Sequence, residues 1–312
     1  MELSSVNSDI QLYLTQRLTI IAKQRSDLEL PNPWPHDDDI LTLTKKSSGL
    51  FIFASTLVRF IESEHHDPNE RLELVVSEAN STVHEGSSGI DSLYSQILLH
   101  AFSDVHEPEV FANMRHVLGT IILAFNPLSC RELSMILGTS ITRISVTLRH
   151  LHSIILVPSD DSKEIRVFHK SFPDFLQDNK RCTNPRFHID PATHHSNMVL
   201  SCLQLMMGLK QNPCSLLPFT MNQDIPNPLQ LLEDKLGGAV RYACSHWARH
   251  LGLSLTSGRH IGQVISLITN LLKNAPLWIE VMSLENHLEE VIHSIYSLLN
   301  WLSNVSSSVI QA

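Results

Sequence analysis

At positions 167–176 the chain reads VFHKSFPDFL, which places His169 between the end of an apolar strand and the start of a helix. Ser171 is expected to cap backbone N–H groups of that helix, and Asp174, three positions later, completes a capping-box pattern. The helix also has an apolar face, formed by Phe172, Phe175 and Leu176. A histidine held at such a junction can be directed across a domain interface, for example toward a phosphate.

The segments before this stretch predict a winged helix. Spaced apolar residues indicate helices over 114–125, 133–137 and 141–151, and β-rich residues then indicate strands over 154–157 and 165–169. Three helices followed by a two-stranded hairpin form the element order of this helix-turn-helix variant.

Local end signals support several of these helices. Ser129 and Glu132 form a capping-box pattern, and Gly138 is placed to end the short helix that follows. Nearer the N-terminus, the acidic run at 37–39 is expected to begin a helix that carries an apolar stripe as far as Ile61.

The fold class expected for the whole chain is mainly α. It comprises a helical domain over 1–104, a central winged-helix domain over 105–180 with one small β-hairpin, and a C-terminal helical domain over 181–312. The chain has 312 residues, which is enough for two or three domains with separate cores.

Composition restricts the classes of function. A formal net charge of −9 disfavours a nucleic acid as the main ligand, because such binding depends on clustered Lys and Arg. The sequence shows neither a secretory signal nor an apolar run long enough to cross a bilayer, so we expect a cytoplasmic protein without a membrane partner. The five cysteines are widely spaced and odd in number, which indicates reduced thiols. The 18 histidines are scattered, and we expect most of them at the surface.

Several motifs resemble, in the same order, the region that follows the nucleotide-binding core of fungal NACHT-domain proteins. These are signal-transducing ATPases of the STAND class, allied to NOD-like receptors. The resemblance extends from about residue 8 to about residue 251 and rests on the segments 9–14, 49–54, 59–61, 68–72, 91–98, 127–129, 167–176 and 242–251.

The resemblance implies a switch. In such proteins ADP locks the winged helix against the nucleotide-binding domain, a histidine of the winged helix contacts the β-phosphate, and exchange for ATP releases that contact. His169 matches the sensing position, with Ser171 and Asp174 supporting its geometry. Protein domains, namely a NACHT core and sensor repeats, are the partners that the resemblance implies.

The sequence departs from the full family pattern in its catalytic parts. It has no G-x-x-x-x-G-K-[ST] loop to hold phosphates and no apolar strand ending in paired acids to hold Mg²⁺. We therefore expect a non-catalytic portion, either a fragment or a degenerate member, with no cofactor of its own and with ADP or ATP bound only when a NACHT core is present.

Other interpretations remain open. His169 could be a strand histidine that bonds a neighbouring carbonyl. His246 and His250, near Cys244, have a helical spacing that could hold zinc, but structural use is favoured. Arg143, Arg149 and His150 on the third helix of the winged helix could contact DNA. The chain could also be a plain helical interaction scaffold.

Overall fold

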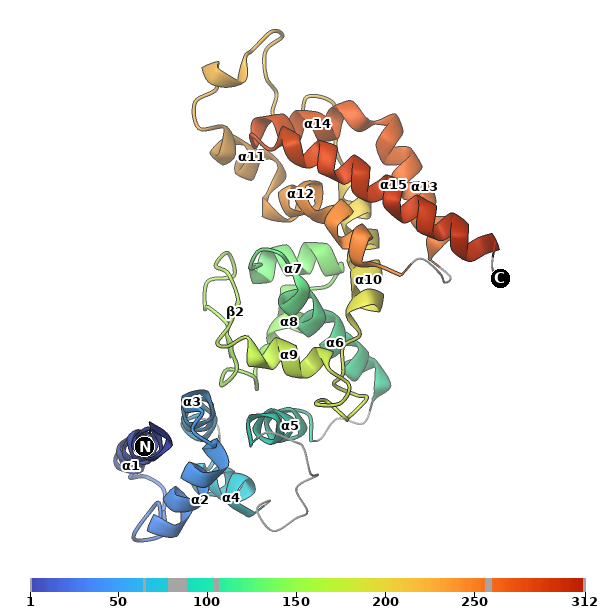
Figure 1. Cartoon of the computed structure of the whole chain (residues 1–312). Coiled ribbons are helices and arrows are strands. Elements are labelled where there is room, and N and C mark those ends of the chain that lie inside the picture. The colour runs from blue at the N-terminus through green and yellow to red at the C-terminus, as the bar shows by residue number, and fades with distance from the viewer. Residues whose placement is uncertain (1, 64–65, 78–88, 104–106, 256–259, 311–312) are drawn as a thin grey trace. The chain divides into compact units, whose positions relative to one another are not determined.

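The computed structural model describes residues 2–63, 66–77, 89–103, 107–255 and 260–310. Within these ranges the chain forms fifteen α-helices and a single two-stranded antiparallel sheet, which confirms the mainly α fold with one small β-hairpin (Figure 1). None of the helices in these ranges has the length and apolar character needed to cross a bilayer.

The chain divides into two compact units that are not contiguous in sequence. Unit 1 comprises residues 1–111, 148–157 and 166–188, and unit 2 comprises residues 112–147, 158–165 and 189–312. The three-domain division expected from the sequence stays a prediction.

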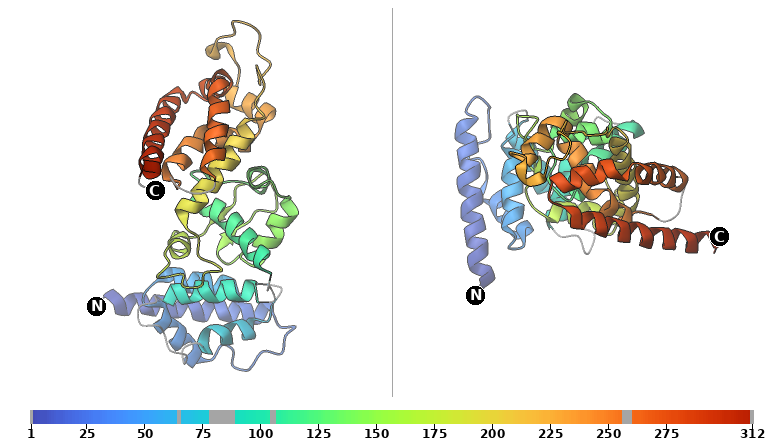
Figure 2. Two further views of the ribbon diagram at one scale, coloured as in Figure 1. Left: turned by 90° about the vertical axis from the view of Figure 1, so that its right-hand side faces the viewer. Right: turned by 90° about the horizontal axis from the view of Figure 1, so that it is seen from above.

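Unit 1 consists of helices and one hairpin. Its elements are α1 (Glu2–Gln24), α2 (Asp37–Ser47), α3 (Phe51–Ile61), α4 (Pro68–Ser77), α5 (Gly89–Ala101), β1 (Ile155–Leu156), β2 (Arg166–Val167) and α9 (Ser171–Gln177). Helix α1 packs against α2 and α3 (Figure 2), and α5 packs against α3, α4 and α9. The core of this unit is apolar and includes Leu14, Phe53, Leu57, Tyr94 and Phe172.

The single helix expected from the acidic run to Ile61 is wrong. Asp37, Asp38 and Asp39 do begin α2, but the helix ends at Ser47. Ser48 and Gly49 then take the left-handed conformation, with φ of 48° and 77°, and α3 starts afresh at Phe51. Left-handed backbone cannot continue a right-handed helix, so the apolar stripe is carried by two helices.

Unit 2 is entirely helical apart from its loops. Its elements are most of α6 (Pro108–Leu123), then α7 (Cys130–Leu137), α8 (Ile141–Leu148), α10 (Pro191–Met206), the 3₁₀ turn η2 (Asn222–Asp224), α11 (Pro228–Leu236), α12 (Gly238–Leu253), α13 (Ile261–Lys273), α14 (Ala275–Leu284) and α15 (Leu288–Ile310). Helix α12 is central, because α7, α10, α11, α14 and α15 all pack against it. Two buried tryptophans join α12 to α14. The ring centres of Trp247 on α12 and Trp278 on α14 lie 5.6 Å apart, and Trp278 Nε1 donates to the Cys244 carbonyl of α12 at 3.0 Å.

The order α6, α7, α8, β1, β2 is the order predicted for a winged helix. The Ser129–Glu132 capping box is confirmed, since Glu132 N–H donates to Ser129 Oγ and Ser129 N–H donates to the Glu132 carboxylate at 2.7 Å. Gly138 ends α7 in the left-handed conformation, also as predicted. The hairpin is shorter than expected, and the third helix ends at Leu148 rather than at Leu151.

Candidate functional site

His169 lies in the junction between β2 and α9 in unit 1. The strand pairing Ile155↔Val167 is followed by one further bond, in which Phe168 N–H donates to the Ile154 carbonyl at 3.0 Å. The Arg59 guanidinium lies 4.1 Å from the centre of the Phe168 ring. The hairpin therefore fixes the chain up to Phe168, and α9 fixes it again from Ser171.

The His169 ring is exposed, and its hydrogen bonds define its tautomer. Ser171 N–H donates to His169 Nδ1 at 3.1 Å, and Ser171 Oγ lies 2.8 Å from the same nitrogen. A backbone N–H can only donate, so Nδ1 is the unprotonated nitrogen and the neutral ring carries its proton on Nε2. No described residue accepts a hydrogen bond from that Nε2–H group, which leaves a donor directed to solvent.

Ser171 connects the histidine to the core of unit 1. Its Oγ lies 2.8 Å from the hydroxyl of Tyr94, which is 1% exposed. Burial raises the pKa of the Tyr94 phenol, so this hydroxyl keeps its proton and can donate to Ser171. Tyr94 in turn packs against Phe172 and Phe175 of α9, with ring centres 5.1 and 5.7 Å away. The imidazole is thus held by a chain of contacts that ends in a packed aromatic cluster.

The capping box predicted for Ser171 and Asp174 is wrong. Lys170 occupies the N-cap position with helical backbone angles and its side chain makes no capping bond, while the first N–H of α9, on Ser171, donates to the His169 ring. Ser171 is the first residue of the helix, and its hydroxyl is engaged by Tyr94 and His169 instead. The Asp174 carboxylate is exposed and bonds none of the described residues. Its negative charge in the first turn interacts favourably with the dipole of α9 and so stabilises the helix. It does not position the imidazole of His169.

An ion pair fixes the chain just after α9. Arg181 donates to both carboxylate oxygens of Asp91, through Nη2 at 2.6 Å and Nε at 3.1 Å. Asp91 is on α5 and is 5% exposed. Helix α9 is consequently anchored to α5 at both ends, by Tyr94 near its start and by Asp91 beyond its end.

Three histidines of unit 2 are exceptions to the expectation that most histidines lie at the surface. His194 and His195 on α10 and His250 on α12 are 6%, 5% and 0% exposed. Phe125 N–H and Tyr242 OH lie 3.3 Å apart, Tyr242 OH lies 2.8 Å from His250 Nε2, and His250 Nδ1 lies 2.8 Å from His195 Nδ1. These contacts join the Phe125 N–H, the Tyr242 hydroxyl and the His250 and His195 rings in one hydrogen-bonded row, in which the Phe125 N–H donates to Tyr242.

His194 has a separate partner. The Thr120 hydroxyl donates to the His116 carbonyl at 2.9 Å, so Thr120 Oγ1 accepts from His194 Nε2–H at 3.1 Å. Burial lowers the pKa of His194 to about 3 and that of His250 to about 2, with neighbouring histidines adding to both effects. These rings are neutral structural groups in the folded chain.

The zinc interpretation gains nothing from this arrangement. In the parts of the chain that the structure describes, no group of three or more His, Cys, Asp or Glu side chains could hold a metal ion. His246 Nε2 lies 3.0 Å from Asn126 Nδ2, and His250 bonds Tyr242 and His195. All five cysteines are buried free thiols, as expected.

The residues considered for DNA contact do not share one helix. Arg143 is exposed on α8, but Arg149 and His150 follow the end of that helix. Arg149 and His150 instead border a pocket of unit 1. No local sequence pattern indicates that pocket, because its lining residues come from segments almost 80 positions apart.

No protein-family model, curated protein or solved structure matches this chain. The resemblance to NACHT-type ATPases therefore rests on the sequence motifs alone.

Proposed function

We propose that this chain is the non-catalytic regulatory and interaction portion of a NACHT-type signal-transducing ATPase. In this proposal the segment 105–180 senses the nucleotide state and locks neighbouring domains together. The observation that supports it is the exposed His169 ring, whose Nδ1 accepts from Ser171 and whose Nε2–H is directed to solvent.

The chemistry of the contact follows from this geometry. An N–H group that donates to a phosphate oxygen forms a charge-assisted hydrogen bond, which is shorter and stronger than a neutral one. Because Ser171 and Tyr94 hold the ring in place, little conformational freedom is lost when the bond forms. The nucleotide itself would be held by a NACHT core, and the bond would break when the core and this chain separate.

The proposal is tested by supplying a NACHT core as a separate polypeptide. The core is taken from the upstream part of the same gene or from an intact family member of the same genome. Its affinity for this chain is measured calorimetrically with ADP and with an ATP analogue. We expect tighter association with ADP, and a loss of about 10- to 100-fold for His169→Ala, because a hydrogen bond to a charged group contributes about 1.5–3 kcal/mol.

A matched control is His293→Ala, since His293 is an exposed histidine on α15. This variant is expected to bind the core as the unchanged chain does. Equal binding with the two nucleotides, or an unchanged affinity for His169→Ala, contradicts the proposal.

A further inference from the structure

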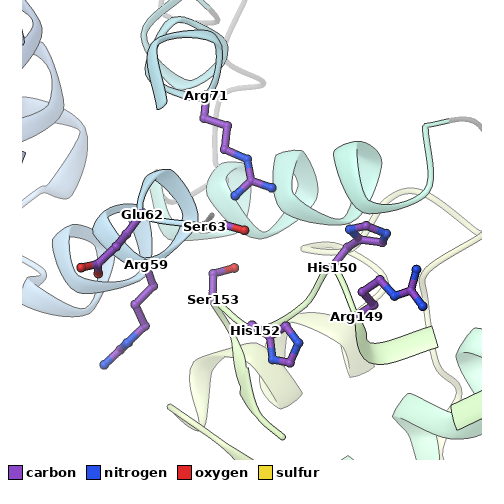
Figure 3. Close-up of a pocket in the computed structure, with 8 residues that line it drawn as sticks. All are labelled: Arg59, Glu62, Ser63, Arg71, Arg149, His150, His152 and Ser153. Carbon is purple, nitrogen blue, oxygen red and sulfur yellow. The ribbon is translucent and has the colours of Figure 1, made fainter. Parts of the chain in front are cut away.

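Unit 1 contains a pocket with a strong excess of hydrogen-bond donors. Its volume is about 320 Å³, at the lower end of the range found for small-molecule sites. It is lined by the end of α3 and the residues that follow it, by α4, and by the segment between α8 and β1 (Figure 3). The lining residues are Arg59, Glu62, Ser63, Arg71, Arg149, His150, His152 and Ser153.

The charge of the pocket is positive although the chain is acidic. Three arginines line it, Arg59, Arg71 and Arg149, against a single carboxylate. Both oxygens of that carboxylate, on Glu62, accept from Arg17 Nη2 at 2.9 Å. Figure 3 shows the Glu62 side chain directed away from Arg71. Glu62 is thus neutralised from outside the pocket and does not balance its arginines.

Arg71 is the central donor. It is 4% exposed, its guanidinium lies 4.3 Å from the centre of the Phe60 ring, and Nη1 donates to the Phe60 carbonyl. Its Nε–H is buried without a hydrogen-bond partner, and no described carboxylate pairs with it. Burial lowers the pKa of this guanidinium to about 10. A buried charge without a counter-charge destabilises the folded protein. An anion that binds next to Arg71 would supply that counter-charge, so the electrostatic attraction between the two would favour binding.

Ser153 supplies a second unsatisfied group. It is 6% exposed, and its Oγ is buried without a partner among the described residues. Figure 3 shows the Ser63 and Ser153 hydroxyls pointing into the space beneath the Arg71 guanidinium. Arg59 and Arg149 line the pocket on either side of this space, with their guanidinium groups directed away from it (Figure 3). The Arg71 guanidinium and the two serine hydroxyls therefore face one volume, and the other two arginines add positive charge at its edges.

We propose that this pocket binds a phosphate group, either inorganic phosphate or the phosphate of a small metabolite. The Arg71 guanidinium and the hydroxyls of Ser63 and Ser153 donate to its oxygens, while Arg59 and Arg149 supply positive charge at the sides. A tetrahedral oxyanion fits because it has acceptors on all sides and compensates the arginine charge, as neither a neutral nor a cationic ligand could. The site does not include His169 and is independent of the regulatory function proposed above.

The test is isothermal titration of the full chain with inorganic phosphate, in a phosphate-free buffer and against chloride at equal ionic strength. We expect saturable binding to the unchanged chain and at least a five-fold loss for Arg149→Gln and for Ser153→Ala. Arg149 is exposed, so its replacement leaves the core intact. Arg143→Gln, an exposed arginine outside the pocket, is the matched control and should bind as the unchanged chain does.

Glycerol 3-phosphate distinguishes the two sources of the phosphate. Tighter binding of the ester assigns the site to a phosphorylated metabolite, and tighter binding of inorganic phosphate assigns it to the free ion. Absence of saturable binding of either compound, or equal binding by Arg149→Gln, Ser153→Ala and the unchanged chain, overturns the proposal. His169→Ala is expected to leave phosphate binding unchanged. A negative result for the phosphate site can therefore be distinguished from a negative result for the proposed regulatory function.

Discussion

At the scale of single residues, the most unusual feature is the burial of neutral histidines in unit 2. His194 bonds Thr120, and His250 bonds both Tyr242 and His195, so each buried ring has its polar atoms partly satisfied. Such rings avoid the cost of a buried charge only while they remain neutral.

These histidines should make stability depend on pH. The folded-state pKa values of about 3 for His194 and about 2 for His250 lie below the ordinary value of 6.5, so the unfolded chain takes up protons first as the pH falls. Their contribution is complete above about pH 6.5 and is lost as the pH falls toward the folded-state values. At pH 5 each ring should lower the free energy of unfolding by about 2 kcal/mol relative to neutral pH.

Urea unfolding at neutral pH and at about pH 5 measures this loss. His194→Gln is expected to lose less stability than the unchanged chain over the same interval, whereas the exposed His293→Gln should behave as the unchanged chain. Equal pH dependence in all three proteins would show that the buried rings do not control it.

Roles that depend on a partner far away in the sequence could not be predicted from local sequence patterns. The local pattern at 171–174 predicts a cap, but the Ser171 hydroxyl is taken by Tyr94, a residue 77 positions earlier. In the same way, nothing near His195 indicates that its partner is His250, 55 positions later. His169 could be proposed from the sequence because strand, histidine and helix follow one another directly in the chain.

At the scale of elements, the His194 side chain of α10 packs directly against α6 at Gly119. A Cβ atom at this position would lie 2.5 Å from Cε1 and 2.6 Å from Nδ1 of His194. The His194 ring is buried and bonded to Thr120, so it cannot move aside without losing that bond. Glycine is therefore required here by packing, although it weakens the helix.

Gly119→Ala should lower the free energy of unfolding by about 1–2 kcal/mol. Overpacking a core costs about 1–3 kcal/mol and outweighs the gain of up to about 1 kcal/mol from helix propensity. Gly252→Ala on α12 is the matched control, since a Cβ there meets no atom within 4 Å and only the gain remains. Chemical denaturation of both variants provides the comparison, and a stabilised Gly119→Ala protein would contradict the expected clash.

Helix ends with local sequence signals could be predicted. Helix ends that interrupt a continuous apolar spacing were harder to predict. The box at Ser129 and Glu132 and the final Gly138 were correct because each acts within one helical turn. The break at Ser48 was missed because the apolar spacing continues across it. Helices α11 and α14 were not predicted as separate elements, although each has a proline in its first turn, Pro228 and Pro276, that is typical of a helix start.

At the scale of the whole molecule, segments of unit 1 and unit 2 alternate along the chain. Residues 112–147 belong with residues 189–312, although segments of unit 1 lie between them. Within unit 2, Tyr242 bonds Phe125 and His194 bonds Thr120, and α7 packs against α10 and α12. The C-terminal helices therefore depend on residues that precede the hairpin.

A piece limited to residues 181–312 should be less stable than a piece comprising residues 112–312. The shorter piece lacks the partners of Tyr242, His194 and His246, and three lost hydrogen bonds amount to about 3 kcal/mol even before lost apolar burial is counted. Thermal unfolding of the two pieces followed by circular dichroism measures the difference. Equal melting temperatures would instead support 181–312 as an independent domain.

The interleaving also has a consequence for biosynthesis. Unit 1 cannot be completed before residue 188 has left the ribosome, and α7 emerges well before α10 and α12, the helices that pack against it. Apolar surface of a nascent chain stays exposed until the segments that cover it have been synthesised, and exposed apolar surface is prone to aggregate. A chaperone that shields such surface would be needed most while translation proceeds between α7 and α12.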